Sequence, residues 1–176
     1  ESKPRVDALA PDNIMIFMTG PLTGTIAPCT PKHVVITKSP LTGGIGDSNC
    51  GGDWGPELRF AGYDGIIFEG VAPKPVYMWI HDGAVEFKSA DKLWGKGVWD
   101  TEDMIREEIG EKNAKIASIG PAGENLVLIA GIINRKHRAA GRAGVGAVMG
   151  SKNLKAIAVK GSKKVPIANE TKLREA

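Results

Sequence analysis

Cysteine is scarce in this sequence. Only Cys29 and Cys50 occur, far apart, and they form no Cys-x-x-Cys pair. Zinc and iron–sulfur sites usually take their ligands from closely spaced cysteines, so the sequence contains no such ligand set. A low cysteine content is also typical of a reducing compartment, and we therefore expect a cytoplasmic location.

Long apolar runs and a strong net charge are lacking too. No apolar segment approaches the ~20 residues that span a membrane. The N-terminal residues Glu-Ser-Lys-Pro lack the apolar core of a signal peptide. The formal net charge of +3 is too small to indicate a nucleic-acid partner. We expect neither a membrane nor a nucleic acid among the partners.

Glycine, in contrast, is abundant. The chain has 23 glycines among 176 residues, roughly twice the usual ~7%. The excess should lie in loops and at close backbone approaches. The length fits one domain, residues 1–176. The start without methionine and the helix-like sequence of residues 170–176 indicate truncation at both ends.

Hydrophobic patterning predicts a sheet-dominated α+β fold of packed β-sheets with short helices. Strands are predicted at residues 13–18, 33–37, 65–69, 76–80, 85–88, 115–119, 126–133 and 156–160. Helices are predicted at residues 53–62, at about 100–108 and up to Met149, and residues 43–52 and 120–125 are predicted to be a loop and a turn. The Asp82-Gly83 pair between two strands is a strong hairpin signal.

Residues 134–150 combine a cationic run with a series of glycines. The cations are Arg135, Lys136, His137, Arg138 and Arg142, and the glycines are Gly141, Gly144, Gly146 and Gly150. Glycine lets a backbone approach a ligand closely, and cations beside exposed N–H groups bind anions. This pattern predicts a phosphate-type site. A glycine-rich turn that leads into a helix and has a solvated basic face is the alternative.

The common phosphate and catalytic motifs do not match. Gly150 is followed by Ser151 and only then by Lys152, which breaks the P-loop pattern, and Gly144, Gly146 and Gly150 miss the dinucleotide-binding spacing. The histidines, His33, His81 and His137, have no metal-ligand spacing, and no Ser/His/Asp or Cys/His set occurs. Glu57, Glu69, Glu107 and Glu108 are interpreted as surface or helix-face acids. The residues predict a binding domain without catalytic residues of its own.

Asn49 is the candidate polar residue of the second glycine-rich segment, residues 43–52. It lies just before Gly51 and Gly52. Its amide oxygen could ligate a hard cation such as Mg²⁺, which commonly accompanies phosphates. An asparagine that makes an Asx turn is the alternative.

Several longer motifs resemble the N-terminal domain of tungsten-containing aldehyde ferredoxin oxidoreductases. They are residues 20–25 (Gly-Pro-Leu-Thr-Gly-Thr), 37–43 (Thr-Lys-Ser-Pro-Leu-Thr-Gly), 49–52, 57–64, 119–125 (Ile-Gly-Pro-Ala-Gly-Glu-Asn), 137–142 (His-Arg-Ala-Ala-Gly-Arg) and 150–156 (Gly-Ser-Lys-Asn-Leu-Lys-Ala). The resemblance covers nearly the whole chain and keeps the motifs in order.

The resemblance implies a base of β-sheets under a bis-pterin cofactor that holds tungsten, or sometimes molybdenum, with Mg²⁺ bridging the pterin phosphates. Asn49 and the backbone carbonyl of Ala139 would then lie at the Mg²⁺. Further residues would line the pterin and its phosphates, namely Gly51, Arg138, Ala140, Gly141 and Arg142. Where the family commonly has Gly-Gly-Arg-Tyr, this chain has Thr-Pro-Lys-His at residues 30–33, so Lys32 replaces a cofactor-contacting arginine.

The whole enzyme implied by the resemblance oxidises aldehydes to carboxylic acids and passes electrons through a [4Fe–4S] cluster, held outside this chain, to ferredoxin. Its partners would be ferredoxin, a small aldehyde and the remaining domains of the polypeptide, with a homodimer as a further expectation. Two alternatives remain. One is a stand-alone nucleotide- or phosphate-binding module; the other is an interaction domain in which Tyr77 and Trp79 form a partner surface.

Overall fold

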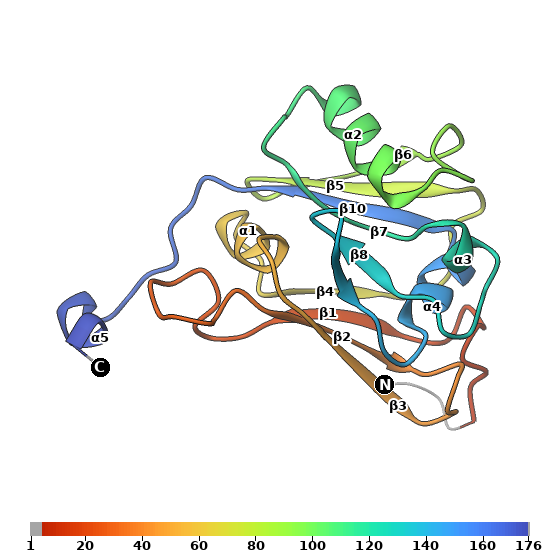
Figure 1. Cartoon of the computed structure of the whole chain (residues 1–176), viewed down its shortest axis with the longest axis horizontal. Helices are drawn as coiled ribbons and strands as arrows, with labels where there is room; N and C mark the ends of the chain where they lie inside the picture. The colour runs from red at the N-terminus through yellow and green to blue at the C-terminus, as the bar shows by residue number, and fades with distance from the viewer. Residues whose placement is uncertain (1–4, 176) are drawn as a thin grey trace.

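A computed structural model describes residues 5–175 and contains two β-sheets packed face to face, with short helices at their ends and on one outer face (Figure 1). The strands are β1 (Met15–Thr19), β2 (His33–Lys38), β3 (Ile45–Cys50), β4 (Gly65–Phe68), β5 (Val76–His81), β6 (Ala84–Ser89), β7 (Lys115–Ser118), β8 (Ile132–Asn134), β9 (Arg138–Ala140) and β10 (Leu154–Lys160). The helices are α1 (Trp54–Phe60), α2 (Val98–Ile109), α3 (Pro121–Glu124), α4 (Val145–Ser151) and α5 (Glu170–Glu175). The predicted α+β class is confirmed.

The smaller sheet is antiparallel, with the strand order β3-β2-β1-β4. The prediction of a loop over residues 43–52 was wrong here, because Ile45–Cys50 forms the edge strand β3 and pairs with the whole of β2. Glycine, aspartate and asparagine are depleted in strands, which is why the local sequence points the other way. Exposed and buried residues alternate along β3, but the apolar Ile45 is exposed and the polar Ser48 is buried, so the sequence does not show this alternation.

The larger sheet has the order β6-β5-β10-β7-β8-β9. Its β5–β10 pair is parallel and its other neighbouring pairs are antiparallel. The predicted hairpin joins β5 to β6, and Asp82 and Gly83 in its turn have φ values of 45° and 95°. Both are left-handed conformations, which this residue pair adopts readily in a two-residue hairpin turn.

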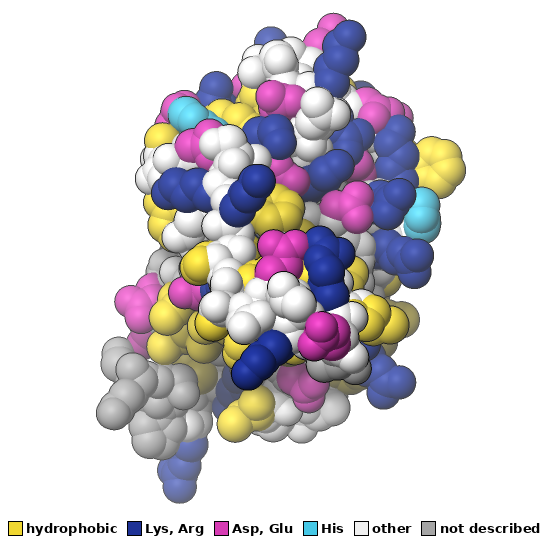
Figure 2. All heavy atoms as spheres, turned by 90° about the vertical axis from the view of Figure 1, so that its left-hand side faces the viewer, with side chains coloured by type: hydrophobic (Ala, Val, Ile, Leu, Met, Phe, Trp, Pro, Cys, Tyr) yellow, Lys and Arg dark blue, Asp and Glu magenta, His cyan; other side chains and the backbone are white. Residues whose placement is uncertain are grey.

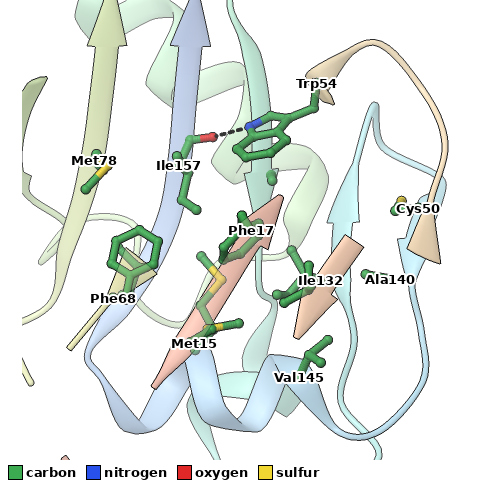
Figure 3. Packing of buried hydrophobic residues seen from close by; sticks show 14 of the residues in the cluster. Met15, Phe17, Cys50, Trp54, Phe68, Met78, Ile132, Ala140, Val145 and Ile157 are labelled. Carbon is green, nitrogen blue, oxygen red and sulfur yellow. Dashed lines mark hydrogen bonds between the residues drawn. The ribbon is translucent and has the colours of Figure 1, made fainter. Parts of the chain in front are cut away.

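The main hydrophobic core lies between the two sheets (Figure 3). Phe17 of β1 and Trp54 of α1 pack with ring centroids 5.5 Å apart. The Trp54 Nε1 donates a hydrogen bond of 3.0 Å to the Ile157 carbonyl of β10. An aromatic side chain with a satisfied N–H therefore joins the small sheet, α1 and the large sheet.

A second core lies on the other face of the large sheet, under α2. It contains Tyr77 and Trp79 of β5, Ile105 of α2 and Ala158 of β10. Tyr77 is fully buried and Trp79 is 8% exposed, so the interpretation of these two aromatics as a partner surface was wrong. Alternate side chains along β5 point to opposite faces, and α2 covers the face that carries both rings (Figure 1).

Two further predictions from the sequence were wrong because tertiary contacts, and not local sequence, determine the structure at those positions. The predicted strand 126–133 is reduced to Ile132–Asn134, because residues 126–129 form an exposed turn after α3 in which Leu126 has a φ of 57°. Glu57 was interpreted as a surface or helix-face acid. It lies in α1, but its carboxylate is buried and accepts hydrogen bonds from the Lys160 Nζ at 2.9 Å and the Gly161 N–H at 3.0 Å.

The packing of helix α4 explains the three glycines of residues 144–150. A Cβ added at Gly144, Gly146 or Gly150 would overlap backbone atoms of the neighbouring segments, and residues 145–150 are all buried. These glycines permit close packing of α4 against α3 and the loop that follows it. The N-terminus of α4 is therefore closed to ligands. For Gly144, Gly146 and Gly150 the alternative interpretation, a glycine-rich turn that leads into a helix, is the one that applies.

The exterior carries mixed charge. Figure 2 shows lysine and arginine side chains interspersed with aspartate and glutamate over one face. Over residues 5–175, none of the helices has both the length and the apolar character that a membrane span requires. Because the charges in Figure 2 are interspersed, this face has no large region of one sign, and a binding site for a charged ligand would depend on a few neighbouring side chains.

Candidate functional site

The two segments predicted to hold an anion and a cation lie side by side in space. The Arg142 N–H donates a hydrogen bond of 2.9 Å to the Ser48 Oγ of β3. Near the other end of β3, the Asn134 side chain donates one of 3.2 Å to the Gly51 carbonyl. A Cβ at Gly46 would overlap the Ala143 side chain, so glycine is required for this close approach. Residues about ninety positions apart thus form one surface.

A hollow of about 530 Å³ lies between these segments. It is lined by Asp47, Ser48, Asn49, Ala139, Gly141 and Arg142. The sequence had predicted Asn49, Ala139, Gly141 and Arg142 as site residues, and the fold brings these together. Asn49 and Ala139 lie on β3 and β9, so each strand contributes one of the two predicted Mg²⁺ ligands.

The other predicted residues take different positions. Gly51 follows β3, and Arg138 begins β9 and packs beside the neighbouring glycine, Gly52. Ala140 is fully buried in the main core, so only its backbone is available to a ligand (Figure 3). Lys32 lines an adjoining hollow of about 450 Å³, which shares Asn49 with the first.

Asp47 is a residue of the hollow that sequence reasoning missed. It lies two positions before Asn49 on β3, and both side chains are exposed on the same face of the strand. Its Oδ2 accepts a hydrogen bond of 3.3 Å from the Asn49 Nδ2. Reading residues 45–50 as a strand would have grouped the two side chains, because alternate residues share a face. The hollow therefore offers a carboxylate as well as amide and carbonyl oxygens.

The cationic run divides into paired and unpaired residues. Arg135 pairs with Asp53 at 3.3 Å and Lys136 pairs with Asp103 at 2.6 Å. In contrast, Arg138 and Arg142 are exposed, and within residues 5–175 they make no ion pair. Arg142 lines the hollow and Arg138 directly precedes Ala139, which also lines it. Two arginines without an ion pair therefore lie at the hollow, and an anion site requires such charges.

Two titratable groups lie at buried positions of β2 and β3, where His33 and Cys50 are paired across the strands. Burial lowers the pKa of His33 to about 4, so its imidazole is neutral near pH 7. Burial raises the pKa of the Cys50 thiol, and the Asn134 hydrogen bond and the Arg138 charge oppose that change. Both groups are uncharged in the fold, so neither supplies a poised base or a thiolate.

The part of the chain that the structure describes contains no cluster of side chains that could hold a metal ion by itself. No group of three or more histidine, cysteine, aspartate or glutamate side chains is placed to hold an ion there. Mg²⁺ differs from zinc in this respect, because it keeps several waters and commonly binds one or two protein oxygens together with phosphate oxygens. Such a partial ligand set is what Asn49, Asp47 and the Ala139 carbonyl offer.

We expect Gly51→Ala to weaken ligand binding without destabilising the chain. A Cβ at Gly51 would meet no protein atom within 4 Å, so the space beside it is open. Gly52→Ala is the contrasting variant, because Gly52 has a φ of 97° and its Cβ would lie 2.6 Å from the Asn134 Oδ1. Chemical denaturation should show a loss of about 1–3 kcal/mol for Gly52→Ala only. Equal losses in both variants would contradict the assignment of Gly51 to ligand contact.

Comparison with known proteins identifies the domain. Residues 1–161 match the family model described as aldehyde ferredoxin oxidoreductase, N-terminal domain. The tungsten-containing aldehyde ferredoxin oxidoreductase of Pyrococcus furiosus is 60% identical over 172 residues, which cover 98% of this chain and 28% of the relative. The enzyme of the same name from Pyrococcus abyssi is 58% identical over 175 residues, covering 99% of this chain and 29% of the relative.

A solved structure agrees with these relatives. The active-site complex BamBC of benzoyl coenzyme A reductase, with bound 1,5-dienoyl-CoA, has a TM-score of 0.93 and 43% sequence identity, covering 96% of this chain and 26% of that chain. This chain thus spans less than a third of the length of the relatives that it matches. The match extends over both sheets and both segments of the hollow, and the chain belongs to the aldehyde ferredoxin oxidoreductase family of oxidoreductases, corresponding to the N-terminal domain.

Proposed function

We propose that this domain binds the phosphate-bearing part of a tungsten (or molybdenum) bis-pterin cofactor, with Mg²⁺, in the hollow between β3 and β9. The observation that carries the proposal is that oxygen-bearing groups of Asn49 and Ala139 line one hollow with Arg142, and that Arg138 directly precedes Ala139 on β9. Neither arginine forms an ion pair among residues 5–175. Phosphates require fixed donors and positive charge, and a phosphate-bound Mg²⁺ requires a few hard oxygens.

Two glycines in these segments also leave room for a ligand. Gly51 has open space where a side chain would begin, and a Cβ at Gly141 would meet only the Ala139 Cβ, at 3.7 Å. Neither glycine is required by packing, in contrast to those of α4, so both remain available for close backbone contact with a ligand. Lys32, in the adjoining hollow, would add a point charge where the family arginine offers a planar fork.

The bound cofactor would supply the redox chemistry, in which an aldehyde is oxidised to a carboxylic acid with oxygen from water. The domain would bind and orient the cofactor and set its electrostatic surroundings. We assign no catalytic residue to this chain. Electrons would leave through a [4Fe–4S] cluster bound outside residues 1–176 and pass to ferredoxin, so that turnover would require the remaining domains of a longer polypeptide. The high identity to relatives named as aldehyde oxidoreductases favours aldehydes as the substrate class.

We expect Asn49→Ala and Arg138→Ala each to reduce the tungsten and pterin content of the anaerobically purified full-length protein severalfold. Asn49→Ala removes a Mg²⁺ ligand, and Arg138→Ala removes a charge-assisted donor, an interaction of about 1.5–3 kcal/mol. Tungsten, molybdenum and iron are measured by plasma mass spectrometry, and pterin by fluorescence after oxidation. Arg174→Ala is the matched control, because Arg174 is an exposed residue of α5 whose carboxylate partner lies in the same helix.

Unchanged pterin content in both variants would overturn the site assignment. A wild-type protein without any group 6 metal or pterin would overturn the proposed function itself. In that case a calorimetric titration with nucleotides tests the phosphate-binding alternative, which predicts micromolar affinity in the hollow between β3 and β9.

A further inference from the structure

Asn134 is the last residue of β8 and lies between the two segments of the hollow. Its side chain is buried, with the residue 3% exposed. The Nδ2 donates to the Cys50 Sγ at 3.0 Å and to the Gly51 carbonyl at 3.2 Å. In the sheet, Asn134 is the partner of Arg138. A single residue therefore holds the end of β3 with its side chain and the start of β9 with its backbone.

The surroundings of Asn134 fix this orientation. The neighbouring Gly52 has a φ of 97°, and only a residue without a Cβ fits there, because the Asn134 Oδ1 occupies the space. That Oδ1 is buried and has no hydrogen-bond partner within the described part of the chain. A buried polar atom without a partner is costly, so the hydrogen bonds of the Asn134 Nδ2 must offset that cost. The orientation of the side chain is therefore set by the Nδ2, which donates to Cys50 and Gly51.

The tip of the β8–β9 hairpin is held separately, by α2. Lys136 has a φ of 62°, its N–H donates to the Glu102 Oε2 at 2.9 Å, and its carbonyl accepts from the Trp99 Nε1 at 2.8 Å. These contacts hold the turn against α2, while Arg135 of the same turn pairs with Asp53, just after β3, at 3.3 Å. Asn134 and Arg138 are the strand pair next to this turn, and the Asn134 side chain links that pair to Cys50 and Gly51 at the end of β3.

We infer that Asn134 is a positioning residue for the cofactor site. It sets the distance between the Asn49–Gly51 segment, which would bind the Mg²⁺, and the Arg138–Arg142 segment, which would bind the phosphates, so that both segments contact the same cofactor. This inference rests on the proposed function. Asn134 does not itself contact the cofactor in this scheme. Its effect reaches the ligand through the Gly51 carbonyl and through the start of β9.

The test uses the full-length protein and the variants Asn134→Ala, Cys50→Ala and Leu93→Ala. Pterin retention is measured by fluorescence after equilibration in a series of Mg²⁺ concentrations. Asn134→Ala should raise the Mg²⁺ concentration for half retention about tenfold, since the lost hydrogen bonds together contribute on the order of 1.4 kcal/mol. Cys50→Ala leaves the hydrogen bond to the Gly51 carbonyl intact and should raise the Mg²⁺ concentration for half retention less than threefold.

Leu93→Ala controls for lost stability. Leu93 is buried in the second core under α2, so its truncation should lower the melting temperature without moving the Mg²⁺ midpoint. Hydrogen exchange gives a second readout, in which amides of residues 49–52 and 138–142 should exchange faster in Asn134→Ala than in Leu93→Ala. A Mg²⁺ midpoint and local exchange in Asn134→Ala equal to those of the wild type would overturn the inference. A wild type without pterin would overturn the proposed function, which the Asn134 variants alone cannot do.

Discussion

Glu124→Gln should lower the free energy of unfolding by about 3–5 kcal/mol, as is typical when one partner of a buried ion pair is removed. Glu124 of α3 pairs with Lys155 of β10, and the two side chains are 3% and 0% exposed. Burial lowers the pKa of Lys155, while the Glu124 carboxylate opposes that change. Without this carboxylate, the ammonium group would remain buried without a countercharge or would have to lose its proton.

The ion pair also fixes the loop before α2. The Glu124 Oε2 accepts a hydrogen bond of 2.8 Å from the Gly95 N–H, and the Lys155 Nζ donates one of 2.9 Å to the Lys96 carbonyl. Glutamine at position 124 keeps an acceptor for Gly95, so the effect of the variant is confined mainly to the lost charge. Guanidinium unfolding of the 176-residue chain, followed by circular dichroism, measures the loss.

The double variant Glu124→Leu/Lys155→Met separates pairing from packing. It removes both buried charges, and the exposed Gly95 and Lys96 backbone groups can bind water instead. We expect it to be at least 2 kcal/mol more stable than the single variant Glu124→Leu, because similar replacements of buried ion pairs by apolar side chains are often neutral or stabilising. If Glu124→Gln and Glu124→Leu each lowered the free energy of unfolding by less than about 1 kcal/mol, water would have to reach the ion pair.

Acidification from pH 6.5 toward pH 4 should cost the chain about 3 kcal/mol through His33 alone. Burial lowers the pKa of His33 to about 4 in the fold, while the unfolded chain has the ordinary value of about 6.5. The unfolded state therefore binds a proton first, and stability that is fully present above pH 6.5 is lost as the pH falls toward 4. The neutral ring packs on Trp54 with centroids 4.7 Å apart, where a charge would be costly.

His33→Phe tests this linkage. Phenylalanine keeps a flat ring beside Trp54 and removes the His33 Nδ1, which has no hydrogen-bond partner among the described residues. The decline in unfolding free energy between pH 6.5 and 4.5, a range above most carboxyl pKa values, should become shallower. His81→Gln is the control, because His81 lies at the exposed end of β5 beside Glu86. An unchanged slope in His33→Phe would refute the assignment.

Much of the fold could be predicted from local sequence, and the failures share a cause. The hairpin at Asp82 and Gly83, the stop of α2 at Gly110 and the apolar strands all follow from short-range rules. The strand β3 does not, because its glycine, aspartate and asparagine disfavour strands and pairing with β2, which lies outside its local sequence, holds them in one. The exposed turn at residues 126–129 shows the reverse case, in which an apolar run finds no neighbouring strand to pair with.

The sequence by itself determined the family and the residues proposed to hold the cofactor, because these depend on the identity and order of motifs such as residues 49–52 and 137–142. Only the tertiary structure decided which glycines have open space beside them and which serve packing. Gly51 and Gly150 are the same residue type, yet one has open space where a Cβ would begin and the other has backbone. The fold also decided that Arg135 is paired and Arg138 is not, since the partner Asp53 comes from a segment remote in sequence. The space beside a glycine and the pairing of an arginine both depend on residues from segments distant in sequence, and a local sequence pattern contains no information about those residues.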